Sequence, residues 1–247
     1  MRIDVAPRAA ALAAYDLSRW RVVVMDAVRA STTVAHAIAT GAEAVIPMAT
    51  VEEARSCHAR LVAEAKQTGR PAPLLAGERL GLPLPGFDLG NSPSEFTPER
   101  VKGRVIVLTT TNGAVAMAHA AKARETIVGA FANLPAVVRY LVRHGGDVLL
   151  VAAGREDAPV LDDTVCAGMY AAKLAEAVPG AELTDMAHVT RLLYQSWAGR
   201  IEEALRVSAS GQALIRQGLG ADLPACAAVG SCEAVPMLHG GEIRAAV

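Results

Sequence analysis

Short runs of β-branched and aliphatic residues alternate with longer alanine-rich stretches, and this alternation constrains the fold more than any other feature of the chain. The apolar runs lie at residues 22–25, 44–46, 105–108, 126–128 and 148–151. Continuously apolar strands separated by helical segments are typical of a parallel sheet with both faces covered. The sequence therefore predicts an α/β fold with a mainly parallel or mixed sheet and helices on both faces.

Helices are expected at residues 31–40, 51–68, 114–122, 134–144, 161–177 and 184–207. Thr50 and Glu53 have the spacing of a capping box, and Asn133 before Leu134 and Pro135 indicates another helix start. Residues 71–98 are rich in glycine, proline and small polar residues, which predicts a long structureless connection with a functional role. The last predicted helix and the glycine-containing tail that follows it are expected to be mostly solvated helix and loop.

A shift of the sequence by 83 positions aligns Val22 with Val105, Val24 with Val107, and residues 35–37 with residues 118–120. Such matches suggest two similar βαβα halves, of about residues 1–100 and 101–247, with a ligand site between them. Matches of this kind also arise by chance in a chain rich in alanine and valine. The prediction is a single α/β unit of residues 1–247, and the duplication within it stays open.

Composition favours a globular protein that acts on small molecules. The 247 residues are 52% hydrophobic and 20% charged, with a formal net charge of -1. This balance argues against a basic nucleic-acid-binding surface and against a polybasic membrane-binding segment. Four cysteines without a C-x-x-C pair are expected to be reduced thiols. Without a signal-peptide pattern or a membrane-length apolar run, the chain is expected to be cytoplasmic.

The first candidate site is the junction between the apolar run 22–25 and the following helix, with Asp26, Arg29, Ser31 and Thr32. Free N–H groups at a helix start favour an anion, which Arg29 could bind through two hydrogen bonds. Asp26 would supply a hard oxygen ligand for Mg²⁺. The alternative is that Ser31 or Thr32 only caps the helix and that Asp26 is a strand-end carboxylate.

A second strand-to-helix junction contains Thr110, Thr111, Asn112 and Gly113. Hydroxyl and backbone N–H groups at this junction could surround a phosphate that approaches closely at the glycine. A simple helix cap followed by a glycine turn explains the same residues equally well.

The third junction contains Arg155 and, at the start of the next helix, Asp163. Carboxylates beside an arginine at the sheet edge lie where α/β proteins bind ligands, although acidic residues in a first helical turn also suit the helix dipole. In the connection 71–98, Glu78 and Arg79 form either a ligand site or a surface ion pair. Asn91 and Ser92 either cap a turn or bind a ligand.

Five short motifs follow one another along most of the chain. They are Asp26-x-x-Arg29-Ala30-Ser31-Thr32-Thr33, Ala76-Gly77-Glu78-Arg79, Gly86-Phe87-Asp88-Leu89-Gly90-Asn91-Ser92-Pro93, Thr109-Thr110-Thr111-Asn112-Gly113 and Asp163-Thr164-x-Cys166-Ala167-Gly168. In this order they resemble the 2-phosphosulfolactate phosphatase (ComB) family. The resemblance implies a ComB-like α/β fold and Mg²⁺-dependent hydrolysis of 2-phospho-3-sulfolactate to sulfolactate and phosphate, a step on the route to coenzyme M. Ala27 and residues 155–157 depart from the family pattern.

The hypothesis for the mechanism assigns Mg²⁺ and catalysis to Asp26, Glu78 and Asp163, with a carboxylate-oriented water attacking in line. The substrate-binding residues would be Arg29, Ser31, Thr32, Arg79, Asn91, Ser92, Thr110, Thr111, Asn112, Gly113 and Arg155. An aspartyl-phosphate route through Asp26 is less favoured, because Val28 occupies the position where dehalogenase-type phosphatases have a second aspartate.

Two alternatives from other functional classes stay open. The chain could bind a phosphorylated or sulfonated metabolite without turnover, as a sensor does, or it could transfer the phosphoryl group to an acceptor other than water. The several carboxylates beside the anion-binding groups argue against a pure anion binder. A homodimer is the default assembly for a soluble protein, although no sequence feature defines an interface.

Overall fold

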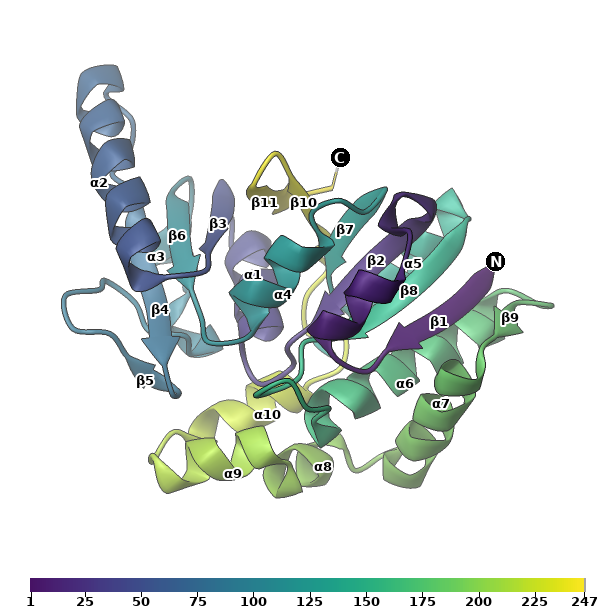
Figure 1. Ribbon diagram of the computed structural model, residues 1–247. Coiled ribbons are helices and arrows are strands. Elements are labelled where there is room, and N and C mark those ends of the chain that lie inside the picture. Colours follow the sequence, from purple (N-terminus) through teal and green to yellow (C-terminus); the bar gives the residue numbers. More distant parts are fainter. Residues whose placement is uncertain (247) are drawn as a thin grey trace.

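The alternating apolar runs form strands of a mixed β-sheet in the computed structural model, which describes residues 1–246 (Figure 1). The strands are β1 (Arg2–Ala6), β2 (Trp20–Met25), β3 (Ala44–Met48), β4 (Leu74–Arg79), β5 (Leu82–Pro83), β6 (Val105–Thr109), β7 (Glu125–Val128), β8 (Asp147–Ala152), β9 (Glu182–Leu183), β10 (Pro236–His239) and β11 (Glu242–Ala245). All five predicted strands are present. The predicted α/β class with a mixed sheet is confirmed.

An antiparallel hairpin joins two groups of parallel strands. The order across the sheet is β5-β4-β6-β3-β11-β10-β7-β2-β8-β1-β9. Neighbours are parallel within β4-β6-β3 and within β7-β2-β8-β1-β9. The hairpin β10-β11 pairs antiparallel with β7 on one side and with β3 on the other. Strands of the two predicted halves would be interleaved, because β6 lies between β4 and β3, and β2 lies between β7 and β8. The duplication itself stays a prediction.

Helices cover both faces of the sheet (Figure 1). They are α1 (Ala30–Ala39), α2 (Val51–Thr68), α3 (Pro98–Val101), α4 (Gly113–Ala120), α5 (Leu134–His144), α6 (Leu161–Ala177), α7 (Asp185–Trp197), α8 (Ile201–Val207), α9 (Ala209–Arg216) and α10 (Leu223–Ala227). The bounds of α2, α5 and α6 are those predicted. The capping box of α2 is also confirmed, because Thr50 Oγ1 accepts from Glu53 N and Glu53 Oε2 accepts from Thr50 N, both at 3.1 Å.

The side chains of the central strand β2 alternate between two hydrophobic clusters. Val23 and Met25 pack in the cluster that contains α5 and α6, whereas Val22 and Val24 pack in the cluster that contains α1 and α4. All four side chains are fully buried. At roughly 1.5–3 kcal/mol for each buried aliphatic side chain, this packing fixes the register of β2 and hence the position of the residues that follow it.

The prediction for the C-terminal third was wrong in two respects. The expected helix 184–207 is interrupted at residues 198–200 and forms α7 and α8. The tail is not only helix and loop, because residues 236–245 form the β10-β11 hairpin inside the sheet. Its turn is Gly240-Gly241, with φ of 58° and 84°. Two consecutive positive φ angles are what a two-residue hairpin turn requires, and glycine adopts them without strain.

The connection 71–98 was also predicted wrongly as structureless. It contains β4, which pairs parallel with β6, and the short strand β5. Leu74 and Leu75 at the start of β4 are buried. Glu78 and Arg79 therefore lie at the end of a sheet strand, not within a loop.

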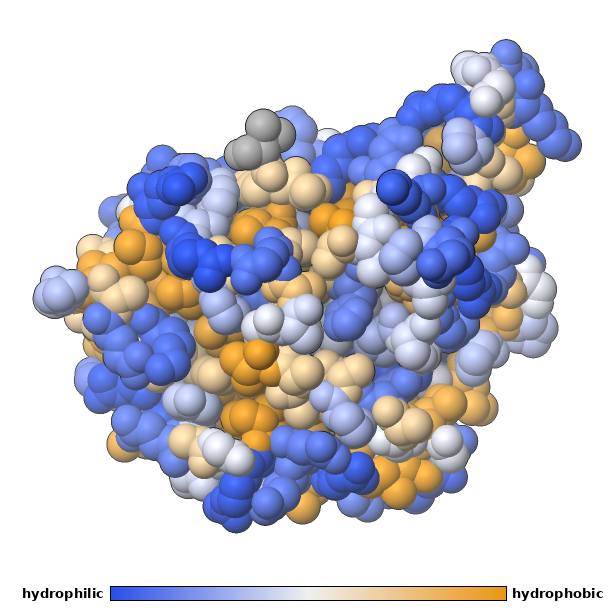
Figure 2. All heavy atoms as spheres, turned by 180° about the vertical axis from the view of Figure 1, so that it is seen from behind, coloured by the Kyte–Doolittle hydropathy of each residue, from blue (hydrophilic) through white to orange (hydrophobic). Residues whose placement is uncertain are grey.

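The surface carries polar and apolar residues side by side, and α2 extends away from the sheet (Figures 1 and 2). Cys57, Cys166, Cys226 and Cys232 are free thiols, as predicted. No helix within residues 1–246 is both long enough and apolar enough to cross a membrane.

Candidate active site

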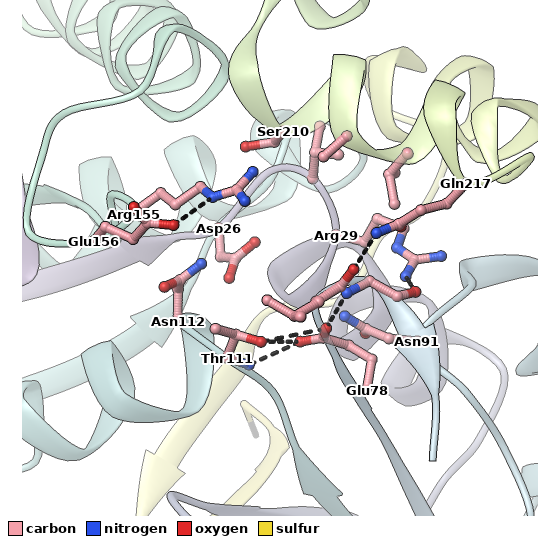
Figure 3. Close-up of a pocket in the computed structure, with 15 residues that line it drawn as sticks. Asp26, Arg29, Glu78, Asn91, Thr111, Asn112, Arg155, Glu156, Ser210 and Gln217 are labelled. Atoms are coloured by element: carbon pink, nitrogen blue, oxygen red, sulfur yellow. Dashed lines mark hydrogen bonds and ion pairs between the residues drawn. The ribbon is translucent and has the colours of Figure 1, made fainter. Parts of the chain in front are cut away.

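A pocket lies where the carboxyl ends of β2, β4, β6 and β8 meet the C-terminal helix α9. Seven of the predicted site residues line it: Asp26, Arg29, Glu78, Asn91, Thr111, Asn112 and Arg155. Figure 3 shows Asp26 near the middle, with Arg155 on one side and Arg29 on the other. Ligands of α/β proteins bind at the carboxyl ends of the strands, so this pocket occupies the expected place.

Asp26 follows directly after β2 and is 8% exposed. Its Oδ1 accepts a hydrogen bond from Ala30 N at 3.2 Å, and no group among residues 1–246 donates to its Oδ2. Burial, followed by the charges of Asp162 and Glu78, raises the pKa of Asp26 from 3.8 to about 7. The carboxylate therefore has a free oxygen at the pocket in a region with a surplus of negative charge.

Gly113, the first residue of α4, leaves the space that the Asp26 carboxylate occupies. A Cβ atom at this position would lie 2.8 Å from Asp26 Oδ2 and 2.6 Å from Ala30 Cβ. The predicted role of Gly113 was contact with the ligand. The structure places it against Asp26, where the absence of a side chain lets the two strand-to-helix junctions approach each other. Its contact with a ligand stays a prediction.

Glu78 connects the ends of β4 and β6. Its Oε1 accepts from Thr111 N at 2.7 Å and from Thr111 Oγ1 at 3.0 Å, while its Oε2 accepts from Gly81 N at 2.6 Å. Glu78 is 6% exposed and lines the pocket. These bonds fix the carboxylate, with a longer contact from Thr111 Oγ1 to Oε2 at 3.3 Å. Oε1 already accepts two hydrogen bonds, so Oε2 has the greater remaining capacity to bind another group.

Arg29 and Arg155 are the cationic residues that line the pocket within residues 1–246. Arg29 is 4% exposed and donates to Asp222 Oδ2 and to the carbonyl of Gly81, both at 2.6 Å. Arg155 is one-third exposed, with Glu156 Oε1 at 3.5 Å from its Nε. One cation is thus fixed and buried, and the other is more accessible to solvent.

Asn91 and Asn112 extend neutral side chains toward the pocket (Figure 3). Asn91 is 4% exposed, and its Oδ1 is a buried acceptor without a partner among residues 1–246. An unpaired amide oxygen in this position costs roughly 1–3 kcal/mol. Asn91 therefore has hydrogen-bonding capacity left for a ligand.

Asp163, a predicted metal ligand, does not line the pocket. Its Oδ1 accepts from Ala27 N at 2.8 Å and its Oδ2 accepts from Gly154 N at 3.0 Å. Burial, with the charges of Asp162 and Asp26, raises the pKa of Asp163 well above its ordinary value. Both oxygens are thus used to hold together the chain segments that leave β2 and β8.

Three predicted ligand-binding hydroxyls form hydrogen bonds within the protein instead. Ser31 Oγ accepts from Asp26 N at 2.9 Å, Thr32 Oγ1 donates to Ala27 O at 2.9 Å, and Thr110 Oγ1 accepts from Ala114 N at 3.0 Å. All three side chains are buried. They shape the two junctions, but neither Ser31 nor Thr32 caps α1, because its N-cap residue is Arg29.

Arg79 and Ser92 also lie outside the pocket lining. Arg79 donates to Glu78 O at 2.7 Å and to Thr109 Oγ1 at 2.8 Å. Neighbouring residues of a strand point to opposite faces, so Glu78 and Arg79 do not reach the same space. Ser92 Oγ donates to Asp222 Oδ1 at 2.6 Å.

The C-terminal wall of the pocket was missed by the sequence reasoning. Ser210, Ala213, Leu214 and Gln217, from α9 and the residue after it, line this wall together with Leu80 and Gly81 from the β4-β5 turn. Gln217 Nε2 donates to the carbonyl of Leu80, which joins the two sides of the wall (Figure 3). Glu156, beside the predicted Arg155, was missed as well. No local motif distinguishes these residues from those of an ordinary surface helix or loop.

The donor set of the pocket fits Mg²⁺. No cluster of three or more metal-ligating side chains (His, Cys, Asp or Glu) occurs within residues 1–246. Mg²⁺, however, is commonly held by only one or two carboxylates, with waters and substrate phosphate oxygens as the other ligands. Asp26 and Glu78 provide two carboxylates at one pocket, and the raised pKa of Asp26 indicates a place where a cation would offset repulsion.

Comparison with known proteins gives a consistent result. The model of the family described as "2-phosphosulpholactate phosphatase" matches residues 8–241. A protein of Symbiobacterium thermophilum is 40% identical over 225 residues, which cover 90% of this chain and 92% of that protein. A protein of Caldanaerobacter subterraneus is 35% identical over 229 residues, with coverage of 93% and 92%. Both relatives are named "Probable 2-phosphosulfolactate phosphatase".

The family match covers every element that contributes to the pocket, from β2 through α9, and the resemblance of the five motifs is confirmed. This chain belongs to the 2-phosphosulfolactate phosphatase family.

Proposed function

We propose that this protein is a Mg²⁺-dependent phosphatase that hydrolyses 2-phospho-3-sulfolactate to sulfolactate and inorganic phosphate. The observation that carries the proposal is the pairing of two carboxylates, Asp26 and Glu78, with two arginines, Arg29 and Arg155, around one pocket. Family membership supports the same reaction.

Asp26 and Glu78 would hold the Mg²⁺ ion. Asp26 offers Oδ2, and Glu78 is fixed by Thr111 and Gly81 so that its oxygens keep their position. The bound ion would polarise the phosphoryl group and offset part of its negative charge. Asp163, which holds the backbone after Asp26, serves in this proposal as a positioning residue and not as a ligand.

The substrate has phosphate, sulfonate and carboxylate groups on three carbons, so it needs more than one cation. Arg29 and Arg155, on opposite sides of Asp26, would bind two of these anionic groups. Asn91, Asn112, Ser210 and Gln217 would donate or accept hydrogen bonds around the rest of the molecule. A pocket for a monoanionic ligand would need neither the second arginine nor so many polar residues.

The reaction follows in-line displacement at phosphorus. Water forms the new P–O bond and loses a proton, the bond from phosphorus to the C2 oxygen breaks, and the released alkoxide takes up that proton to give sulfolactate. The pocket carboxylates would orient the water. A phosphoaspartate route would use an acidic residue two positions after Asp26, and Val28 occupies that position. Direct attack by water is therefore the proposed route.

The proposal extends to location and assembly. A cytoplasmic phosphatase is proposed because the four thiols are free. In organisms that make coenzyme M, the product would enter that route. The proposed homodimer is tested by light scattering coupled to size-exclusion chromatography.

Substrate comparison tests the proposal. Purified protein is stripped with a chelator, Mg²⁺ is restored, and phosphate release is measured with 2-phospho-3-sulfolactate, 2-phospholactate and phosphoglycolate. We expect kcat/KM for the sulfonate at least roughly tenfold above that for either analogue, because both analogues lack the sulfonate, a further anionic group that an arginine would bind. Equal turnover of all three would reject the sulfonate as the specific group. Binding without phosphate release would identify a sensor, and product formation only with an added alcohol would identify a phosphotransferase.

A further inference from the structure

Asp222 holds the guanidinium of Arg29 at the edge of the pocket. Asp222 ends the short 3-10 helix Gly220–Asp222, between α9 and α10. Its Oδ2 accepts from Arg29 Nη1 at 2.6 Å, and the two side chains are only 4% and 10% exposed. Its Oδ1 accepts from Ser92 Oγ at 2.6 Å. Both carboxylate oxygens are therefore used, and Asp222 itself is held in place by Ser92.

The carbonyl of Gly81 gives Arg29 a second anchor. It accepts from Arg29 Nη2 at 2.6 Å. Two anchors on different nitrogens fix the plane of the guanidinium. Arginine has five N–H donors, and the remaining ones donate to no group among residues 1–246, so they are available to an anion.

Arg29 has competing partners in the same pocket. Asp26 and Glu78 both line it, and both are negatively charged when they hold a cation. A buried guanidinium that loses its partner seeks another carboxylate, because an unpaired buried charge is strongly destabilising. Without the charge of Asp222, the carboxylates that line the pocket could replace it, and they include the two residues proposed to bind Mg²⁺.

We propose that Asp222 is a positioning residue that keeps Arg29 directed at the bound anion and away from Asp26 and Glu78. The inference rests on the proposed function and deepens it, because it assigns a role to the C-terminal helical segment. This segment forms one wall of the pocket and also anchors the arginine that binds the substrate.

The test compares Asp222→Asn with a matched control, Glu125→Gln. The Arg21–Glu125 pair is also largely buried, with 2.7 Å between Arg21 Nε and Glu125 Oε2, but it lies at the opposite end of β2 from Asp26. Asn keeps the shape of Asp222 and removes its charge. We measure the affinity for inorganic phosphate by calorimetry in the presence of Mg²⁺, and KM and kcat for 2-phospho-3-sulfolactate.

For Asp222→Asn we expect phosphate affinity to fall and KM to rise by roughly tenfold each, with kcat reduced by less than about threefold. Glu125→Gln should lower the melting temperature and leave phosphate affinity and KM within about twofold of the wild-type values. Phosphate affinity and KM of Asp222→Asn within about twofold of the wild type would overturn the proposal, as would a wild-type protein that binds no phosphate.

A double-mutant cycle separates positioning from general destabilisation. In an Arg29→Lys background, Asp222→Asn should change phosphate affinity by less than about twofold, because the lysine no longer depends on the two-point anchor. A further tenfold loss in that background would show that Asp222 acts without Arg29 and would overturn the proposal.

Ser92→Ala is the substitute variant if Asp222→Asn does not fold, because it removes only the hydrogen bond that holds Asp222. We expect its phosphate affinity to fall by about two- to threefold. Unchanged affinity would contradict the proposal. If the wild type binds phosphate with the expected pattern among the variants but does not hydrolyse 2-phospho-3-sulfolactate, the positioning role stands and the proposed function fails.

Discussion

Asp163 Oδ1 lies 2.8 Å from the backbone nitrogen of Ala27, the residue that follows Asp26. Its other oxygen accepts from Gly154 N at 3.0 Å, after the end of β8. One buried carboxylate therefore holds two strand ends at the floor of the site. The geometry gives Asp163 the task of holding the backbone beside the proposed metal ligands, and metal binding by Asp163 stays a prediction.

Replacement of Asp163 distinguishes these roles. Asp163→Asn turns one acceptor into a donor that faces a backbone N–H, which should cost about 1–3 kcal/mol of unfolding free energy. We expect kcat to fall, and the Mg²⁺ concentration for half-maximal activity to change by less than about threefold. Denaturant unfolding and Mg²⁺ titration measure both effects. A large rise in the Mg²⁺ requirement, as expected for Asp26→Asn, would make Asp163 a ligand.

Thr111 should support Glu78 through its hydroxyl group. Thr111 Oγ1 lies 3.0 Å from Glu78 Oε1. Thr111→Val keeps the shape and loses this donor, so kcat/KM should fall by about three- to tenfold. Thr111→Ser keeps the hydroxyl and should stay close to wild type. Equal activity of the two variants would show that the hydrogen bond does not matter.

Gly113→Ala should displace the Asp26 carboxylate. The added Cβ would lie 2.8 Å from Asp26 Oδ2, so the junction must move. We expect at least roughly a tenfold loss of kcat/KM and about 1–3 kcal/mol of destabilisation. Ala118→Gly, on the exposed side of the same helix, is the control: it should cost about 1 kcal/mol and leave kcat/KM unchanged. Equal losses of activity in both variants would point to helix stability as the cause.

The metal-free protein should become less stable as the pH rises from about 4 to 7. Burial raises the pKa of Asp26 to about 7 and that of Asp162 to about 6. The folded protein then binds more protons than the unfolded chain over this range, so raising the pH favours unfolding. Thermal melting with chelator should give a higher melting temperature at pH 5.5 than at pH 8.

Addition of Mg²⁺ at pH 8 should reverse part of this loss, because the ion binds the charged form of Asp26. Asp26→Asn should weaken both the dependence on pH and the response to Mg²⁺. If the wild-type melting temperature rises with pH in the metal-free state, these carboxyl groups do not govern the stability of the protein.

Local sequence patterns predicted β2, β3, β6, β7 and β8 and the bounds of α2, α5 and α6. The capping box at Thr50 and Glu53 and the buried runs of the central strands depend on neighbours in the sequence, so their signals are local. The Gly240-Gly241 turn is also a local signal, but the flanking strands contain only one β-branched residue, Ile243, and therefore lack the apolar pattern of the central strands. A prediction of β4 as a strand would have placed the side chains of Glu78 and Arg79 on opposite faces of the sheet.

The site was predictable only where residues follow strand ends. Glu78 lies in β4 and Thr111 follows the neighbouring strand β6, and Asp26 and Arg155 follow the neighbouring strands β2 and β8. Four strands separate β6 from β2 in the sheet, so the meeting of these two pairs at one pocket could not be predicted from local patterns. The contacts of Asp222 with Arg29 and Ser92 span 193 and 130 residues, respectively. No local motif around Asp222 predicts these contacts, because they depend on how the C-terminal helices pack over the sheet.

Phosphate release from 2-phospho-3-sulfolactate by metal-stripped protein, with and without Mg²⁺, tests the central claim most directly. Wild type and Asp26→Asn are measured side by side, with Glu125→Gln as the folded control. The account predicts Mg²⁺-dependent release by wild type and control, and at least roughly a hundredfold lower release by Asp26→Asn. Undiminished release without Mg²⁺, or full activity of Asp26→Asn, would contradict it.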